Sequence, residues 1–127
     1  MPVTGLDHYN LCAPQEMLDE LCEFYCDVVG LSIGERPDFS GYGYWLYARD
    51  KPILHLSQAR NPRVTTSEAS FDHDAFKCTD LRGIKGRLSA KGVDYRFARV
   101  PGTPIVQLFF SDPAGNGVEL NFDSESA

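Results

Sequence analysis

Short stretches of alternating apolar and polar residues predict β-strands along most of the chain. In the first half, strands are expected at 4–13, 31–36, 43–48 and 53–57. Between the first two, apolar residues recur at helical spacing and predict a helix from Gln15 to Val29. The first half is therefore expected to run strand, helix and then three strands.

The second half repeats this order. Strands are expected at 70–78, 93–100, 105–111 and 118–122, and a helix capped by Thr79 or Asp80 follows the first of them. An internal repeat of this kind determines the fold class. We therefore predict an α+β fold of two β-α-β-β-β modules in a single domain. Its parts are module one at about 4–58, a linker at about 59–69 and module two at about 70–123, within a domain spanning 1–127.

The two modules open on matching sequences. Residues 6–11 read LDHYNL and residues 71–76 read FDHDAF, so that His8 of the first module corresponds to His73 of the second. Both histidines follow an aspartate and precede an apolar residue three positions later. The match extends the repeat from the order of the elements to single side chains.

The last strands of the two modules also correspond. Residues 54–56 read LHL and residues 118–120 read VEL, which aligns His55 with Glu119. A pseudo-twofold relation between the modules would then pair His8 with His73, and His55 with Glu119. A glutamate in a strand of apolar residues needs a partner, because carboxylates are rarely buried unpaired.

The three histidines of the chain and Glu119 form a candidate metal site. Each is expected in the middle of a strand, which would hold it rigidly. A lone histidine on a strand is more often a core residue, but here every histidine falls on a position that the repeat makes equivalent to another candidate. Imidazole and carboxylate groups suit a divalent ion such as Fe²⁺, Mn²⁺, Ni²⁺ or Zn²⁺. Such an ion supports either iron–dioxygen chemistry or Lewis-acid catalysis.

Composition and charge argue against several classes of protein and partner. The chain has 127 residues and a net charge of −6, which argues against a nucleic-acid partner. Its apolar runs are too short to span a membrane, and residues 1–4 lack the features of a secretory signal, so a cytoplasmic location is expected. The four cysteines form no Cys-x-x-Cys pair and are expected to be reduced thiols.

Four of these stretches resemble the vicinal oxygen chelate superfamily, which includes glyoxalase I, extradiol dioxygenases and bleomycin-resistance proteins. The resemblance covers nearly the whole chain. Its most specific parts are FYCDVVGL at 24–31 and DPAGNGVEL at 112–120, with LDHY at 6–9 and FDHDAF at 71–76.

The resemblance implies a cupped mixed β-sheet around a divalent metal, and a homodimer. His8, His73 and Glu119 match the metal ligands of the family. His55 stands where isomerase and lyase members often have Glu or Gln, so it is a candidate fourth ligand or catalytic base. Asp74 also departs from the family, which usually has an apolar residue there, and it is expected on the opposite face of the strand from His73.

Three functions remain open at this point. The first is a divalent-metal-dependent enzyme acting on a small oxygenated substrate, with a slight preference for a dioxygenase over an isomerase or lyase. The second is a metal-free protein that binds a drug or antibiotic. The third is a transferase or hydrolase of the fosfomycin-resistance type, although no extra substrate- or potassium-binding loop is evident. Candidate pocket walls are Asn10, Tyr44, Trp45, Phe109 and Asn121.

Overall fold

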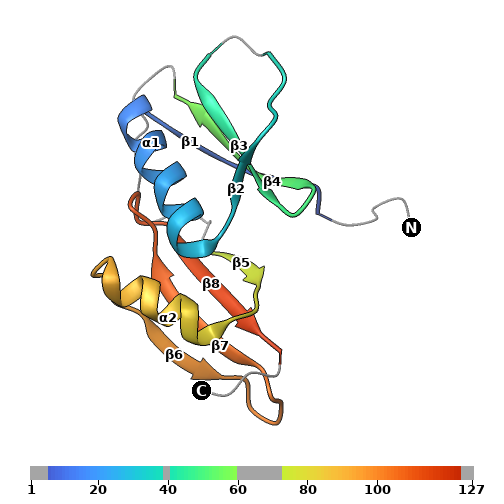
Figure 1. Cartoon of the computed structure of the whole chain (residues 1–127), viewed down its shortest axis with the longest axis vertical. Helices are drawn as coiled ribbons and strands as arrows, with labels where there is room; N and C mark the ends of the chain where they lie inside the picture. Colours follow the sequence, from blue (N-terminus) through green and yellow to red (C-terminus); the bar gives the residue numbers. More distant parts are fainter. Residues whose placement is uncertain (1–5, 39–40, 60–72, 124–127) are drawn as a thin grey trace. The chain divides into compact units, whose positions relative to one another are not determined.

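The computed structural model describes residues 6–38, 41–59 and 73–123. The chain divides into two compact units, Met1–Val64 and Thr65–Ala127 (Figure 1). No helix among the described residues is long and apolar enough to cross a membrane.

Some predicted features lie outside the described residues. The predicted linker at 59–69 is one of them, apart from Ala59. Phe71 and Asp72 of the repeated FDHDAF stretch are others. The module and linker boundaries therefore stay a prediction.

The first unit is a four-stranded mixed sheet with one helical segment. Its elements are β1 (Tyr9–Ala13), α1 (Gln15–Phe24), the π-helical turn η1 (Tyr25–Val29), β2 (Ser32–Gly34), β3 (Gly43–Ala48) and β4 (Lys51–Gln58). The strand order is β1-β4-β3-β2, in which β1 and β4 are parallel and the other pairs are antiparallel.

The second unit has the same topology. Its elements are β5 (His73–Lys77), α2 (Leu81–Ala90), β6 (Arg96–Arg99), β7 (Val106–Ser111) and β8 (Gly117–Phe122). The strand order is β5-β8-β7-β6, with β5 and β8 parallel. The predicted α+β fold of two β-α-β-β-β modules is therefore confirmed.

Capping residues mark the end of the first helical segment and the start of α2. Gly30, with a φ of 99°, ends the first helical segment in the left-handed conformation that glycine adopts without strain. Asp80, rather than Thr79, caps α2 and accepts a hydrogen bond from the backbone N–H of Gly83 at 3.1 Å. A Cβ atom on Gly83 would lie 2.2 Å from the Asp80 carboxylate, so this cap requires glycine there.

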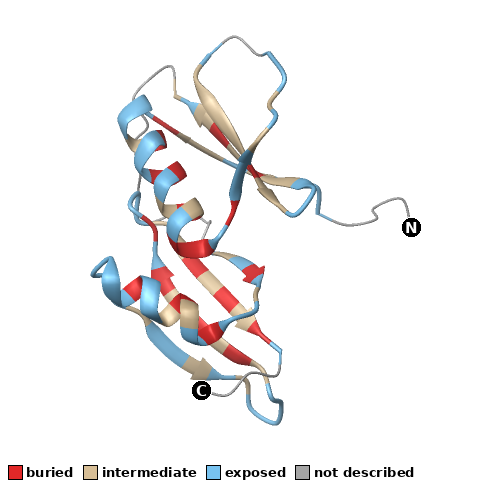
Figure 2. Cartoon of the chain, in the orientation of Figure 1, coloured by how far each residue is buried: buried red, intermediate tan, exposed pale blue. Residues whose placement is uncertain are grey.

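The core of each unit lies between one face of the sheet and the helix. Burial alternates along β7 and β8, so every second side chain faces α2 (Figure 2). The helices contribute Leu18 and Leu21 in the first unit, and Leu81, Ile84 and Leu88 in the second. The other face of each sheet carries His55 or Glu119, which the helices leave open.

One of the four candidate ligands, His8, does not lie in the middle of a strand, where it had been predicted, because it precedes β1. His73 is the first described residue of β5, and the preceding residues of the strand predicted at 70–78 lie outside the described ranges. In the first unit, continuing the β1–β4 register would bring Asp7 opposite Pro52, which has no N–H to donate to the ladder. The ladder between β1 and β4 therefore begins at Tyr9, one residue after the histidine.

Candidate functional site

The strand registers place the candidate ligands in equivalent positions of the two units. In the first unit Asn10 pairs with His55, and in the second Ala75 pairs with Glu119. A histidine stands two residues before Asn10 and another two residues before Ala75. Each unit thus brings together one pair of candidates, which are His8 with His55 and His73 with Glu119.

The second-unit pair has its polar atoms facing one another. Nε2 of His73 lies 3.3 Å from Oε1 of Glu119, whose side chain is 14% exposed. The other carboxylate oxygen, Oε2, accepts hydrogen bonds from Asn121 at 2.8 Å and from Gln107 at 3.4 Å. Gln107 also donates to Oδ1 of Asn121 at 3.0 Å. The two amides therefore fix the orientation of the Glu119 carboxylate.

The turn before β8 is held by a buried carboxylate. Asp112 is 5% exposed, and its Oδ1 accepts hydrogen bonds from the backbone N–H groups of Ala114 and Asn116, both at 2.9 Å. Gly115 lies in the left-handed region with a φ of 87°. This turn starts β8 at Gly117 and so sets the register that orients Glu119.

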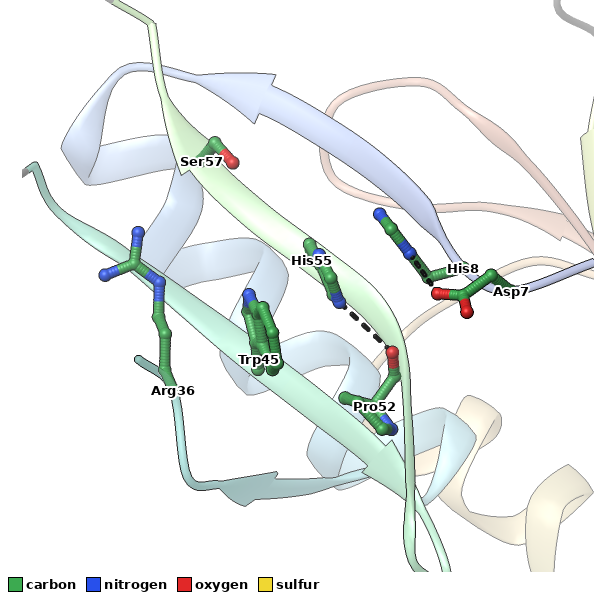
Figure 3. Close-up of a pocket in the computed structure, with 7 residues that line it drawn as sticks. All are labelled: Asp7, His8, Arg36, Trp45, Pro52, His55 and Ser57. Carbon is green, nitrogen blue, oxygen red and sulfur yellow. Dashed lines mark hydrogen bonds and ion pairs between the residues drawn. The ribbon is translucent and has the colours of Figure 1, made fainter. Parts of the chain in front are cut away.

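The first-unit pair is arranged differently, as a stack of rings. The rings of His8 and His55 have centroids 3.7 Å apart and an interplanar angle of 15°. On its other face His55 stacks on Trp45, with centroids 4.1 Å apart and an angle of 11° (Figure 3). Trp45 and His55 are directly opposite on β3 and β4, which accounts for their contact.

Hydrogen bonds assign one nitrogen of each stacked imidazole. Nε2 of His55 donates to the carbonyl oxygen of Pro52 at 3.2 Å, and Nδ1 of His8 donates to the carboxylate of Asp7 at 2.6 Å (Figure 3). Burial, and then the neighbouring His8, lower the pKa of His55, and so favour its neutral form. The hydrogen bond from His8 lowers the pKa of Asp7.

The two pairs differ in how well they fit a metal ion. Ligand atoms about 2.1 Å from one ion lie about 3.0–3.4 Å apart, and the His73–Glu119 separation of 3.3 Å matches this. An imidazole binds along a lone pair in its own ring plane, and two nearly parallel planes do not meet close to both rings. His8 and His55 therefore cannot share an ion while they are stacked. Within the described ranges, no group of three or more His, Cys, Asp or Glu side chains is gathered around one point.

A pocket of about 600 Å³ lies on the open face of the first sheet (Figure 3). Its lining is made of Asp7, His8, Arg36, Trp45, Pro52, His55 and Ser57. Arg36 and Ser57 were not among the candidates from the sequence. Ser57 could have been found, because strand alternation puts it on the same face as His55. Arg36 is the last residue of the strand predicted at 31–36, whereas β2 ends at Gly34.

Four of the five predicted wall residues lie on the expected faces, and one does not. The prediction of Tyr44 as a pocket wall was wrong, because its hydroxyl donates to Asp19 on α1 at 2.6 Å and so faces the helix. Its neighbour Trp45 points to the opposite face, as strand geometry requires. Asn10 accepts a hydrogen bond from Ser57 at 2.7 Å. In the second unit, Phe109 lies directly opposite Glu119 and Asn121 opposite Gln107.

Asp74 lies on the face of its strand that was expected. The neighbouring positions His73 and Ala75 are exposed, whereas Asp74 is half-buried and Phe76 is buried. This alternation puts Asp74 on the side of β5 that faces the core of the second unit.

The fold and the motifs agree with the comparison against protein-family models. Residues 5–120 match the model of the Glyoxalase/Bleomycin resistance protein/Dioxygenase superfamily, and the chain belongs to that superfamily. No curated protein matches the sequence significantly.

Solved structures with the same fold are similar over nearly the whole chain. A glyoxalase family protein from Bacillus anthracis is 22% identical, with a TM-score of 0.75 over 96% of this chain and 97% of its own. A lactoylglutathione lyase from Agrobacterium tumefaciens is 24% identical, with a TM-score of 0.66 over 96% of each chain. An antibiotic-binding protein from a Streptomyces species is 21% identical, with a TM-score of 0.68 over 98% of each chain. At these identities the likeness establishes the fold.

Proposed function

We propose that the chain is a divalent-metal-dependent enzyme acting on a small oxygenated substrate. The observation that carries this proposal is the His73–Glu119 pair. Its nitrogen and oxygen are 3.3 Å apart, the separation expected of two ligands on one ion. The Asn121 and Gln107 amides hold the carboxylate in place, as the outer partners of metal ligands commonly do.

His8 and His55 stay candidate ligands, as the sequence predicts. Nε2 of His55 is occupied by the carbonyl of Pro52, which leaves Nδ1 to take a ligand or, in the role of base, a proton. One of the two rings has to rotate out of the stack before both can bind metal. A divalent ion in this family would supply Lewis-acid activation of a substrate oxygen, or dioxygen chemistry if it is iron.

Metal analysis tests the proposal directly. Protein purified without added metal is expected to carry about one divalent ion per chain, because a preformed ligand pair binds metal during expression. The control is the His73→Ala variant, which is expected to lose the ion while it stays folded. A metal-free wild-type protein whose thermal stability does not change on adding iron, nickel, zinc or manganese would contradict the proposal.

Two assays separate the reaction classes within this proposal. Oxygen consumption with catechols reports a dioxygenase, which three His and one Glu favour. Conversion of a hemithioacetal reports a lyase or isomerase, which the similarity to a lactoylglutathione lyase supports. Activity in one assay and silence in the other assigns the class.

A metal-free binding protein is the second candidate. The observation that favours it is the Trp45–His55–His8 stack, in which the histidines pack as flat walls instead of converging as ligands. The similarity to an antibiotic-binding protein supports it as well. Under this alternative, His73→Ala leaves the affinity for the bound molecule unchanged, whereas the metal-dependent enzyme loses its activity.

We also propose that the protein is a homodimer, as the family resemblance implies. Light scattering coupled to size-exclusion chromatography is expected to give twice the mass of one chain. A mass of 14.2 kDa would contradict this.

A further inference from the structure

The guanidinium of Arg36 lies over the glycine opposite it, Gly43. Gly34 pairs with Trp45, and continuing this register by two residues brings Arg36 opposite Gly43. A Cβ atom on Gly43 would lie 2.9 Å from Nη2 of Arg36. Nη1 donates to the carbonyl oxygen of Gly41 at 3.3 Å. The guanidinium thus lies over the start of β3, against Gly43.

The second unit has no cation at the equivalent place. Gly43 pairs with Ser57, and the corresponding pair in the second unit is Gln107 with Asn121. There the residue opposite Gln107 on the edge strand is Ala98. At this place the second unit has Gln107, whose amide donates to the Glu119 carboxylate. The first unit has Gly43, over which the guanidinium of Arg36 lies.

The pocket offers hydrogen-bond donors and positive charge at this end. Arginine and the tryptophan indole can only donate, and the Ser57 hydroxyl already donates to Asn10. Figure 3 shows the nitrogen atoms of Arg36 and Trp45 turned toward the side on which Ser57 lies. A ligand that presents acceptors and negative charge therefore suits the Arg36 end of the pocket.

We propose that Arg36 binds the carboxylate of a small ligand in this pocket. A guanidinium pairs with a carboxylate through two parallel hydrogen bonds, which no neutral acceptor reproduces. A pocket of about 600 Å³ is large enough for a compact aromatic or heterocyclic acid. The inference rests on the proposed function in taking this ligand as the substrate, but the binding itself needs no metal.

Trp45 makes the binding measurable in the full chain. It is the only tryptophan, and it lines the pocket, so intrinsic fluorescence reports on this site alone. The protein is treated with chelator and titrated with benzoate and with benzamide, its uncharged counterpart. Benzoate is expected to give a saturable change, and benzamide to bind about 10- to 100-fold more weakly, as expected for the loss of charged hydrogen bonds.

Variants assign the effect to Arg36. Arg36→Met is expected to weaken benzoate binding about 10- to 100-fold, and Arg36→Lys, which keeps the charge but loses the paired geometry, by an intermediate factor. The matched control is Arg99→Met on β6, which is expected to bind benzoate like the wild type. If Arg36→Met does not fold, Arg36→Lys provides the comparison.

Three results would overturn this inference. They are the absence of a saturable change with benzoate, equal affinity for benzoate and benzamide, and unchanged benzoate affinity in both Arg36 variants. Because the titration is done without metal, its failure leaves the metal analysis of the wild type and His73→Ala untouched. A failure of the metal analysis likewise leaves the benzoate titration valid.

Discussion

The two units have the same topology and equivalent registers, yet they present different chemistry on their open faces. In the second unit a histidine and a glutamate face each other, and amides from β7 and β8 orient the glutamate. In the first unit two histidines are stacked face to face and continue onto Trp45. Equivalent backbone positions therefore carry a ligand pair in one unit and an aromatic row in the other.

The difference comes from the neighbours of each central-strand residue. Trp45, opposite His55, has a flat ring that stacks on the imidazole. Phe109, opposite Glu119, instead lies under the guanidinium of Arg96, 4.3 Å from its ring centroid. The repeat places each side chain at an equivalent backbone position. The residue opposite it on the adjacent strand then determines where its polar atoms lie.

The largest expected effect is on stability, and it compares the hydrophobic cores of the two units. Leu56 and Leu120 follow His55 and Glu119 on the central strands, and both are fully buried. Leu56→Ala and Leu120→Ala are each expected to lower the free energy of unfolding by about 2–5 kcal/mol, because each leaves a cavity in its unit. Urea unfolding measures both. A near-zero cost in one of them would show that the cores are not equivalent.

The turns before the central strands are expected to differ. Asp112→Ala removes a buried acceptor from two backbone N–H groups and is expected to cost about 2–3 kcal/mol in the free energy of unfolding. Asp50 occupies the exposed turn between β3 and β4, and Asp50→Ala is expected to change stability by less than about 0.5 kcal/mol. Equal costs in urea unfolding would contradict this contrast.

Asn121, whose amide holds Glu119, and Ser57 occupy equivalent positions in the two units and can be compared directly. Asn121→Ala is expected to weaken metal binding about 10- to 100-fold, as removal of an outer partner typically does. Ser57→Ala changes the equivalent residue of the first unit, next to the stacked histidines, and is expected to leave metal affinity nearly unchanged. Isothermal titration with Mn²⁺ compares the two. A larger loss for Ser57→Ala would reverse the assignment of the metal-binding unit.

The smallest expected effect concerns the helix face of the first unit. Tyr42 and Tyr44 both donate to Asp19, and their hydrogen bonds lower the pKa of that carboxyl from 3.8. A lowered pKa adds stability above the ordinary value, and this contribution is lost as the pH falls through the folded value. The stability difference between wild type and Asp19→Asn should therefore shrink below about pH 4. Glu16→Gln, on the same helix, serves as the control, and a difference that grows on acidification would contradict the assignment.

Much of the fold was predictable because alternation, helical spacing and capping glycines act locally. The repeat then aligned His8 with His73 and His55 with Glu119, and the registers give the same equivalence. The side-chain directions were not predictable. The stacking on Trp45 depends on a cross-strand neighbour, and the π-helical turn at Tyr25–Val29 reads in sequence as ordinary helix.

Arg36 was not predicted as a site residue for a related reason. Its guanidinium lies over Gly43 on the neighbouring strand, and the sequence does not show which residues of two strands meet in this way. Tyr44 was misassigned because it and its neighbour Trp45 lie on opposite faces of one strand, and only the hydrogen bond of Tyr44 to Asp19 shows which of the two faces the helix.

The most direct test of the account is the Mn²⁺ affinity of the Glu119→Gln variant, measured by isothermal titration calorimetry. Glutamine keeps the size of the side chain and an oxygen that can accept from Asn121, but it removes the charge beside His73. If His73 and Glu119 hold the ion, Mn²⁺ is expected to bind the variant at least about 100-fold more weakly than the wild type. An unchanged affinity in a folded variant would contradict the assignment of His73 and Glu119 as the metal-binding pair.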